Sequence, residues 1–247
     1  TISDGNRTPE FLARHFSKRS IGLSLTDHND IAGSVYLSKQ KNLLSIPGIE
    51  VTSAQAKDIL GYFYSINDLK EFWEKEIKNK RKNNYGFNLH RTTIDTYDLI
   101  DKIHDYNGLA SLAHPLTLKP KKSYSLLNDN TFLKKIDAIE CFNYVDNHGK
   151  EMLLRSPQFN KPLTAGTDSH IFSLFNSLTF VPFPADTSSF LDALRQNKHG
   201  IFMHEKSFSI RRIQEALMVT KNNIKLWPFS DNGRSIINDL KEKWCKK

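Results

Sequence analysis

The chain has 247 residues, of which 38% are hydrophobic and 25% are charged. Its 35 lysines and arginines exceed its 27 aspartates and glutamates, which gives a formal net charge of +8 at pH 7. This composition is typical of a soluble globular protein and excludes disordered and fibrous classes. No apolar run reaches the roughly 20 residues that a membrane-spanning helix needs, so we expect no membrane partner.

Two features of the composition bear on location and partners. The two cysteines, Cys141 and Cys245, are too few for a disulfide framework, and we therefore expect a cytoplasmic protein with reduced thiols. The positive charge favours anionic partners, either phosphorylated small molecules or nucleic acid. A lysine-rich proteome explains the charge equally well, so the charge alone does not select a partner.

Strand-like and helix-like segments alternate along the chain, which predicts an α/β domain. A helix is expected after Thr8, whose hydroxyl can cap it and which precedes Pro9 and Glu10. The other expected helices cover residues 66–82, 95–106 and 187–197, with a basic helical tail after Phe208. The expected strands cover residues 21–25, 44–51, 59–64, 109–113, 136–142, 163–167 and 177–183.

Histidines and acidic residues recur at or just after the carboxyl ends of the expected strands, where parallel α/β barrels carry their active-site ligands. They are Asp27, His28, Glu50, Asp58, His114, Asp168 and His170. Nitrogen and oxygen donors without cysteine suit zinc, manganese or iron, and two such ions can clamp a phosphoryl group. Each residue alone has an ordinary explanation as a turn or a helix cap. Their recurrence favours a metal site.

Short motifs follow one another along the chain at residues 26–33 (TDHNDIAG), 48–52 (GIEVT), 59–62 (ILGY), 112–115 (LAHP), 139–143 (IECFN) and 165–170 (AGTDSH). Ser3-Asp4-Gly5 looks like the end of an earlier motif. The series resembles the polymerase and histidinol phosphatase (PHP) family of metal-dependent phosphoesterases. The resemblance covers about residues 1 to 200. In that family the first motif begins with a His-x-His pair, which we expect to lie upstream of Thr1.

The resemblance implies a distorted (β/α)7 TIM-like barrel with two or three divalent metal ions (Zn, Mn or Fe) at its mouth. The metal ligands that it implies are Asp4, His28 and His170 for an outlying ion, Glu50 as a bridge, and Asp168 and His114 for the other two ions. A metal-bound hydroxide would attack the phosphorus, and the catalytic residues expected are Asp168 and Asp27. For Asp27 the expected role is to orient a ligand.

Asp58 departs from the family pattern, which usually has histidine at this position. A carboxylate can still bind a divalent cation, so Asp58 stays among the expected ligands, with a shift in preference from zinc towards manganese or iron. The alternative is that Asp58 binds nothing and that the site is partly degenerate.

The segment of about residues 65–107 is expected to form a short helical insertion beside the site. It is rich in lysine and arginine, and we expect Arg81, Arg91 and His90 to contact the substrate, because arginine can hold an anion at two points. For most of the lysines, a solvated helix face is the better explanation. Nucleic acid is the weaker alternative partner, favoured by the basic tail.

The sequence therefore predicts a barrel domain over residues 1–208 and a helical extension over residues 209–247 that packs on it. The expected function is metal-dependent hydrolysis of a small phosphorylated metabolite or nucleotide. Two alternatives remain open. One is a 5'-3' exonuclease-like phosphodiesterase acting on short oligonucleotides, and the other is a degenerate, non-catalytic family member that binds an anion or a partner.

Overall fold

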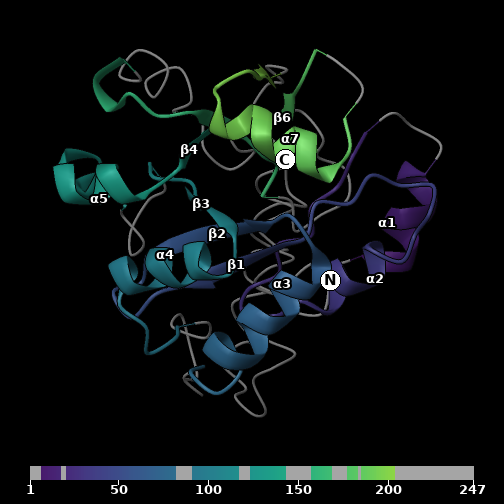
Figure 1. The fold of residues 1–247 in the computed structure, drawn as a ribbon, viewed down its shortest axis with the longest axis horizontal. Helices are drawn as coiled ribbons and strands as arrows, with labels where there is room; N and C mark the ends of the chain where they lie inside the picture. Colours follow the sequence, from purple (N-terminus) through teal and green to yellow (C-terminus); the bar gives the residue numbers. More distant parts are fainter. Residues whose placement is uncertain are drawn as a thin grey trace, which may run out of the picture. The chain divides into compact units, whose positions relative to one another are not determined.

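A mixed five-stranded sheet is the main element of the computed structural model, which describes residues 7–17, 21–81, 91–116, 123–142, 157–168, 177–182 and 185–203 (Figure 1). Its strands, in spatial order, are β1 (Gly48–Thr52), β2 (Asp58–Phe63), β3 (Gly108–Leu112), β4 (Ala138–Phe142) and β5 (Leu163–Ala165). β1, β2 and β3 pair antiparallel, whereas β3, β4 and β5 pair parallel. The described residues all belong to one compact unit, Thr1–Lys206.

A second, two-stranded antiparallel sheet consists of β6 (Ser177–Phe180) and β7 (Gly200–Met203). Thr179 of β6 links it to the main sheet, because its hydroxyl accepts from the Ala165 amide at 2.9 Å and donates to the Ala165 carbonyl at 3.1 Å. The fold is therefore mixed α/β. A closed barrel, as the sequence resemblance implied, is not found in the described part of the chain.

The antiparallel pairing of β1 and β2 follows from their short connection. Residues 53–57 form a tight turn in which the Ser53 amide donates to the Lys57 carbonyl at 2.8 Å, and Ala56 has a positive φ of 59°. A parallel pair would need a crossover of about a dozen residues, which is not present here. Strand directions in this half of the sheet therefore differ from those of an all-parallel barrel.

Most of the expected helices are confirmed. They are α1 (Pro9–Phe16), α3 (Ile66–Phe72) continued by a π-helical turn (Trp73–Ile77), α4 (Thr96–Asp105) and α7 (Thr187–Arg195). Side chains cap α1, α4 and α7: Thr8 accepts from the Phe11 amide, Asp95 from Tyr97 and Asp186 from Ser189. Three short helices were not expected, namely α2 (Ala32–Leu37), a 3-10 turn (Tyr124–Asn128) and α5 (Asn130–Lys135).

Segment 21–25 is not a strand. It makes an isolated parallel bridge from Leu23 to Ser45, and a second one follows from His28 to Glu50. The chain from residue 21 to residue 28 thus runs beside the segment that leads into β1. The expected tail at 209–247 lies outside the described residues, and no described helix is long and apolar enough to cross a bilayer.

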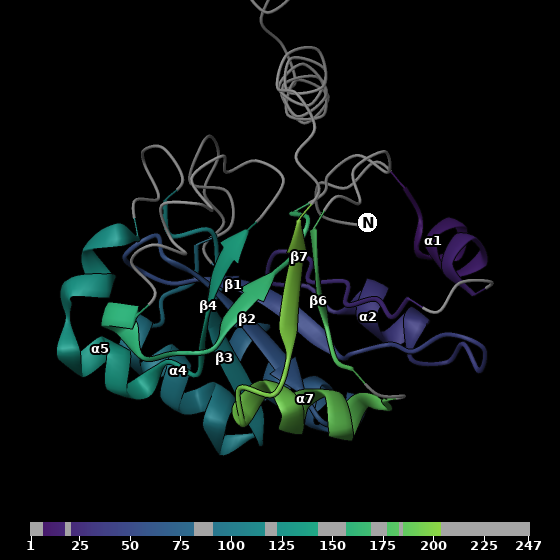
Figure 2. The ribbon, with the colours of Figure 1, turned by 90° about the horizontal axis from the view of Figure 1, so that it is seen from above.

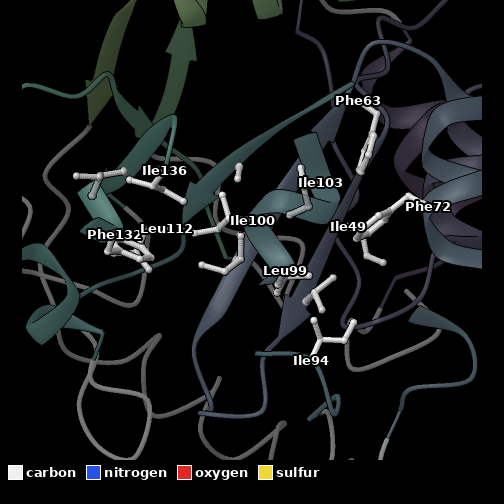
Figure 3. Packing of buried hydrophobic residues seen from close by; sticks show 14 of the residues in the cluster. Ile49, Phe63, Phe72, Ile94, Leu99, Ile100, Ile103, Leu112, Phe132 and Ile136 are labelled. Carbon is white, nitrogen blue, oxygen red and sulfur yellow. The ribbon is translucent and has the colours of Figure 1, made fainter. Parts of the chain in front are cut away.

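One face of the main sheet is apolar along its whole length. Because side chains alternate along a strand, Ile49 and Leu112 project to this face and pack against the helices that cover it (Figure 3). Those helices supply Phe72 from α3, Leu99, Ile100 and Ile103 from α4, and Phe132 from α5. Fully burying one such side chain contributes about 1.5–3 kcal/mol, so this layer is the main source of stability.

The opposite face of the sheet is divided into two parts. At one end Leu109 and Ala138 pack with Leu191 and Leu194 of α7, the helix that lies across the lower ends of β6 and β7 in Figure 2. At the other end the buried side chains are polar or charged: Glu50, Thr52, Asp58 and Glu140. The site is built at this polar end.

Candidate metal centre

Three side chains from different segments form a candidate metal centre. One ligand atom each from His28, Glu50 and Asp58 lies within 4.8 Å of the other two. Glu50 lies inside β1, His28 lies on the segment that bridges to Glu50, and Asp58 is the first residue of β2. Glu50 and Asp58 are buried, with 6% and 0% of their surfaces exposed.

Strand direction explains the position of Asp58. The expectation that the candidate ligands follow the carboxyl ends of parallel strands is wrong for this residue, since it begins its strand. β2 runs antiparallel to β1, and Thr52 at the end of β1 pairs with Asp58 at the start of β2. The antiparallel turn therefore brings the Asp58 carboxylate to the edge that carries Glu50.

His114 adds a fourth donor at the same edge. It follows β3, whose end meets the start of β2 through a hydrogen bond of 3.2 Å from the Ala113 amide to the Asp58 carbonyl. Its Nε2 lies 3.2 Å from Oε1 of Glu50 and 3.6 Å from Oδ2 of Asp58. Four donors expected from the sequence thus converge in the structure.

The charges around His114 determine its protonation. Burial disfavours the imidazolium, but the hydrogen bond to Glu50 and the charges of Asp168, Glu50 and Asp58 outweigh burial and raise the His114 pKa to about 10. Without a metal ion, a proton on His114 is thus the counter-charge to the carboxylates. A divalent cation would take over this role and release the proton, because histidine binds metals in its neutral form.

Glu140, on β4, contacts the loop that carries His114. Its Oε2 accepts from the His114 backbone amide at 2.9 Å. Burial and the nearby Asp168 charge raise the Glu140 pKa to about 8, against the opposing effect of His114. A Cβ on Gly166 would lie 2.6 Å from Oε1 of Glu140, so this position leaves room only for glycine unless Glu140 moves. Glu140 therefore packs between two loops that carry candidate ligands.

In both loops the backbone is strained at the candidate ligand itself, which is His114 in one loop and Asp168 in the other. His114 has a φ of 27° and Asp168 a φ of 43°, in the left-handed region that residues with a Cβ rarely adopt. Such strain is found mostly at functional sites, where the surrounding structure holds it in place. The charge of Asp168 also acts on His114 and Glu140, raising the pKa of both.

Asp27 is buried beside His28 but is directed towards α2. A Cβ on Gly33 would lie 2.7 Å from Oδ2 of Asp27, so the carboxylate packs against the first turn of this helix. The Glu50 amide donates to the Asp27 carbonyl at 3.3 Å, and the Asn29 amide donates to the Glu50 carbonyl at 2.8 Å. These bonds tie the His28 loop to β1.

Thr52 and Glu140 were not among the expected site residues. Thr52 donates to Oδ1 of Asp58 at 2.6 Å, and its Oγ1 lies 3.5 Å from Nδ1 of His28. A signal was present, since Thr52 is two residues after Glu50 and must share its face of the strand. Glu140 belongs to the motif at residues 139–143 (IECFN), for which the family resemblance implied no ligand.

The two expected substrate arginines lie near the His28 side of the centre. The backbone of Arg91 makes an isolated bridge with Thr52, and that of Arg81 makes one with Thr92. Arg81 Nη1 is 3.9 Å from Oδ2 of Asp30, in the loop after His28. The helical insertion contacts the same loop, since Trp73 Nε1 donates to the Asn29 carbonyl at 3.0 Å. The remaining expected site residues, Asp4, His90 and His170, lie outside the described residues.

The donor set fits a divalent cation of the first transition row. Two imidazoles and two or three carboxylates, mostly buried and within a few ångströms of one another, are the ligands that zinc, manganese and iron take. The protein concentrates negative charge here that a cation would neutralise. The arrangement can therefore hold a divalent metal ion.

Comparisons with known proteins agree on the fold. No protein-family model and no curated protein matches the sequence. The structure is similar to a protein from Bifidobacterium adolescentis assigned as a metal-dependent phosphoesterase, with a TM-score of 0.54 and 14% identity over 79% of this chain and 92% of that one. It is also similar to a two-domain protein from Bacteroides vulgatus that contains a PHP-like metal-dependent phosphoesterase, with a TM-score of 0.57 and 15% identity over 82% of this chain.

A third similar structure is Endonuclease Q bound to a 27-mer duplex with an abasic lesion at its active site, with a TM-score of 0.56 and 17% identity over 79% of this chain. The chain spans 62% of the Bacteroides protein and 53% of Endonuclease Q. These similarities show that the chain has the fold of PHP-like metal-dependent phosphoesterases. The resemblance inferred from the motifs is confirmed at the level of the fold.

Proposed function

We propose that the chain is a metal-dependent phosphoesterase that hydrolyses a small phosphorylated metabolite or a nucleotide in the cytoplasm. The observation that carries this proposal is the convergence of His28, Glu50, Asp58 and His114 at one buried edge of the sheet. The fold that these residues occupy is shared with PHP-like phosphoesterases.

These four residues would hold the metal, with Asp168 beside them. By the resemblance, Asp4 and His170 would complete a set of two or three ions. Bound metal would supply an activated water and neutralise charge on the phosphoryl oxygens. Asp27 would act through the His28 loop, whose backbone it ties to Glu50. Because Asp58 adds a carboxylate oxygen where the family usually has an imidazole, we expect manganese or iron to be preferred over zinc.

The positively charged side chains that bind the substrate would come from the insertion at about residues 65–107. Guanidinium groups hold phosphate at two points, and Arg81 and Arg91 lie on the side of the centre where β1 ends. Arg81 is partly exposed and sits 3.9 Å from Asp30, so it can reach solvent and substrate. The sequence adds His90 as a third proposed substrate contact.

The finer architecture is also a proposal. The described strands number seven, as in a distorted (β/α)7 barrel, and Thr179 connects the second sheet to β5. We propose that the two linked sheets form such a barrel without a closed backbone ladder. An experimental structure of the metal-bound protein would test it.

A second candidate function is cleavage of a phosphodiester in nucleic acid. The similarity to Endonuclease Q with its DNA duplex favours it, and the net charge of +8 suits a polyanion. The same metal centre would serve both reactions, so the substrate and not the site distinguishes them.

The test is a substrate panel with the full chain. Protein freed of metal by a chelator would be reconstituted with Mn²⁺, Fe²⁺ or Zn²⁺ and assayed on nucleotides, sugar phosphates, and single-stranded and duplex oligonucleotides. We expect no activity without metal and phosphate release from monoesters with Mn²⁺. Preferential cleavage of oligonucleotides would favour the second candidate. A protein that binds no metal would be the degenerate, non-catalytic family member.

A further inference from the structure

The hydroxyl of Thr52 lies between two of the candidate ligands and contacts both. Its Oγ1 is 2.6 Å from Oδ1 of Asp58 and 3.5 Å from Nδ1 of His28. Thr52 is 2% exposed, so water cannot easily replace its hydroxyl. Thr52, Asp58 and His28 come from separate segments. Thr52 on β1 pairs directly with Asp58 on β2, so the register of the two strands keeps these two residues opposite each other.

We propose that Thr52 is a positioning residue of the metal centre that selects which atoms of His28 and Asp58 face the metal. The inference rests on the proposed function, since it concerns the same centre. It adds a residue that does not bind the metal and acts only through two ligands. Partners of this kind fix the tautomer and the orientation of metal-binding histidines.

The number of protons available between Thr52 and His28 determines the tautomer of His28. A threonine hydroxyl has one hydrogen, and the short contact gives it to the Asp58 carboxylate. The hydrogen bond to His28 therefore needs a proton on Nδ1, which donates to Oγ1. A neutral imidazole with Nδ1 protonated has its lone pair on Nε2, the atom that lies 3.9 Å from Oε2 of Glu50. Nε2 is thus the nitrogen left to bind a metal.

The two carboxylate oxygens of Asp58 have different neighbours. Oδ1 is occupied by the Thr52 hydroxyl, whereas Oδ2 lies 3.6 Å from Nε2 of His114, on the side of the centre. Thr52 therefore leaves one oxygen of Asp58 for the metal and disfavours binding through both. One hydroxyl fixes the donor atom of two ligands.

The experiment compares three variants of the full chain. Thr52→Val keeps the shape and removes the hydroxyl, and Thr52→Ser restores it. Thr96→Val is the matched control: Thr96 is equally buried, and its hydroxyl bonds to Ser53 and Gln55 at 2.8 and 2.9 Å, away from the ligands. Metal-free protein is titrated with Mn²⁺ and with Zn²⁺ against a chromophoric chelator. We expect Thr52→Val to weaken metal binding by about 10- to 100-fold, Thr52→Ser to recover most of the affinity, and Thr96→Val to match the wild type.

A second measurement reads the tautomer directly and needs no substitution at Thr52. Metal-free protein labelled with ¹⁵N-histidine is examined by NMR at a pH where imidazole is neutral, with the His28 signals assigned from a His28→Gln sample. We expect the proton on Nδ1. A proton on Nε2, or a Thr52→Val protein that binds metal as tightly as the wild type, would overturn the inference. Wild-type protein that binds neither Mn²⁺ nor Zn²⁺ would instead refute the proposed function. The proton position on His28 would still show whether the Thr52 hydroxyl fixes the tautomer of that histidine.

Discussion

His114 Nε2 lies 3.2 Å from Oε1 of Glu50, although 64 residues separate the two in the sequence. In the metal-free protein this contact is an ion pair, because the surrounding carboxylates raise the His114 pKa to about 10. The first prediction concerns the pH at which this pair stabilises the fold.

The stabilisation from His114 should be lost at alkaline pH. Its folded pKa of about 10 exceeds the ordinary value of 6.5, so the stabilisation is fully present below about pH 6.5 and disappears as the pH rises through 10. We expect the stability difference between the wild type and His114→Gln to be largest near pH 6 and to shrink towards pH 10. Urea unfolding in the presence of a chelator measures it, and a difference that grows with pH would contradict the assignment.

Gly166→Ala should destabilise the protein through Glu140. The new Cβ would lie 2.6 Å from Oε1 of Glu140, and overpacking of this kind costs about 1–3 kcal/mol. Glu140→Ala removes the clashing atoms, so the effect of Gly166→Ala should largely vanish in that background. A double-mutant cycle from urea unfolding provides the test. Additive effects would show that the two residues do not press on each other.

Asp58→Asn should improve stability without metal and abolish the response to metal. The charges of Asp168, Glu50 and Asp58 all act on the single imidazolium of His114, so removing one negative charge should stabilise the metal-free fold, by about 1 kcal/mol. Wild-type protein at 100 times the metal Kd should gain about 2.7 kcal/mol, whereas Asp58→Asn should gain little.

Thermal unfolding with and without Mn²⁺ separates these two effects. The matched control is Asp101→Asn, on the exposed side of α4, where Asp101 pairs with Lys135. This variant should keep the full response to the metal. A metal response retained in Asp58→Asn would remove Asp58 from the centre.

Arg81→Lys and Arg91→Lys should weaken substrate binding more than catalysis. Lysine keeps the charge but loses the two-point contact with phosphate. We expect a roughly tenfold rise in KM, equivalent to about 1.4 kcal/mol, with a small change in kcat. Arg14→Lys, on the exposed side of α1, is the control. Unchanged KM values in both variants would mean that the insertion does not hold the substrate phosphate.

Much of the fold could be predicted because burial imposes a regular pattern on the sequence. Short apolar-rich runs located β1 to β5, and the cap at Thr8 located α1. Strand direction was the part that failed, since residues 53–57 form a turn too short for a parallel crossover. That one connection determines whether Asp58 lies at the site or at the far end of the sheet.

The site was only partly predictable, for a related reason. His28, Glu50, Asp58 and His114 carry chemistry that marks them in a sequence, and the structure brings them together. Thr52 is an ordinary strand residue by type, and its role depends on a contact across the β1–β2 pair. Roles that arise from pairing between strands need the register, which single-sequence patterns do not give.

The Glu50 carboxylate lies 3.2 Å from Nε2 of His114 and 3.9 Å from Nε2 of His28, so its substitution tests the proposed metal centre most directly. The measurement is phosphate release from a panel of phosphomonoesters by Mn²⁺-reconstituted wild type and Glu50→Gln, at equal concentrations of folded protein. The account predicts turnover by the wild type, and reduction of Glu50→Gln to the level of chelator-treated protein. Turnover by Glu50→Gln at the wild-type rate, or none by the wild type on any phosphoester, would contradict it.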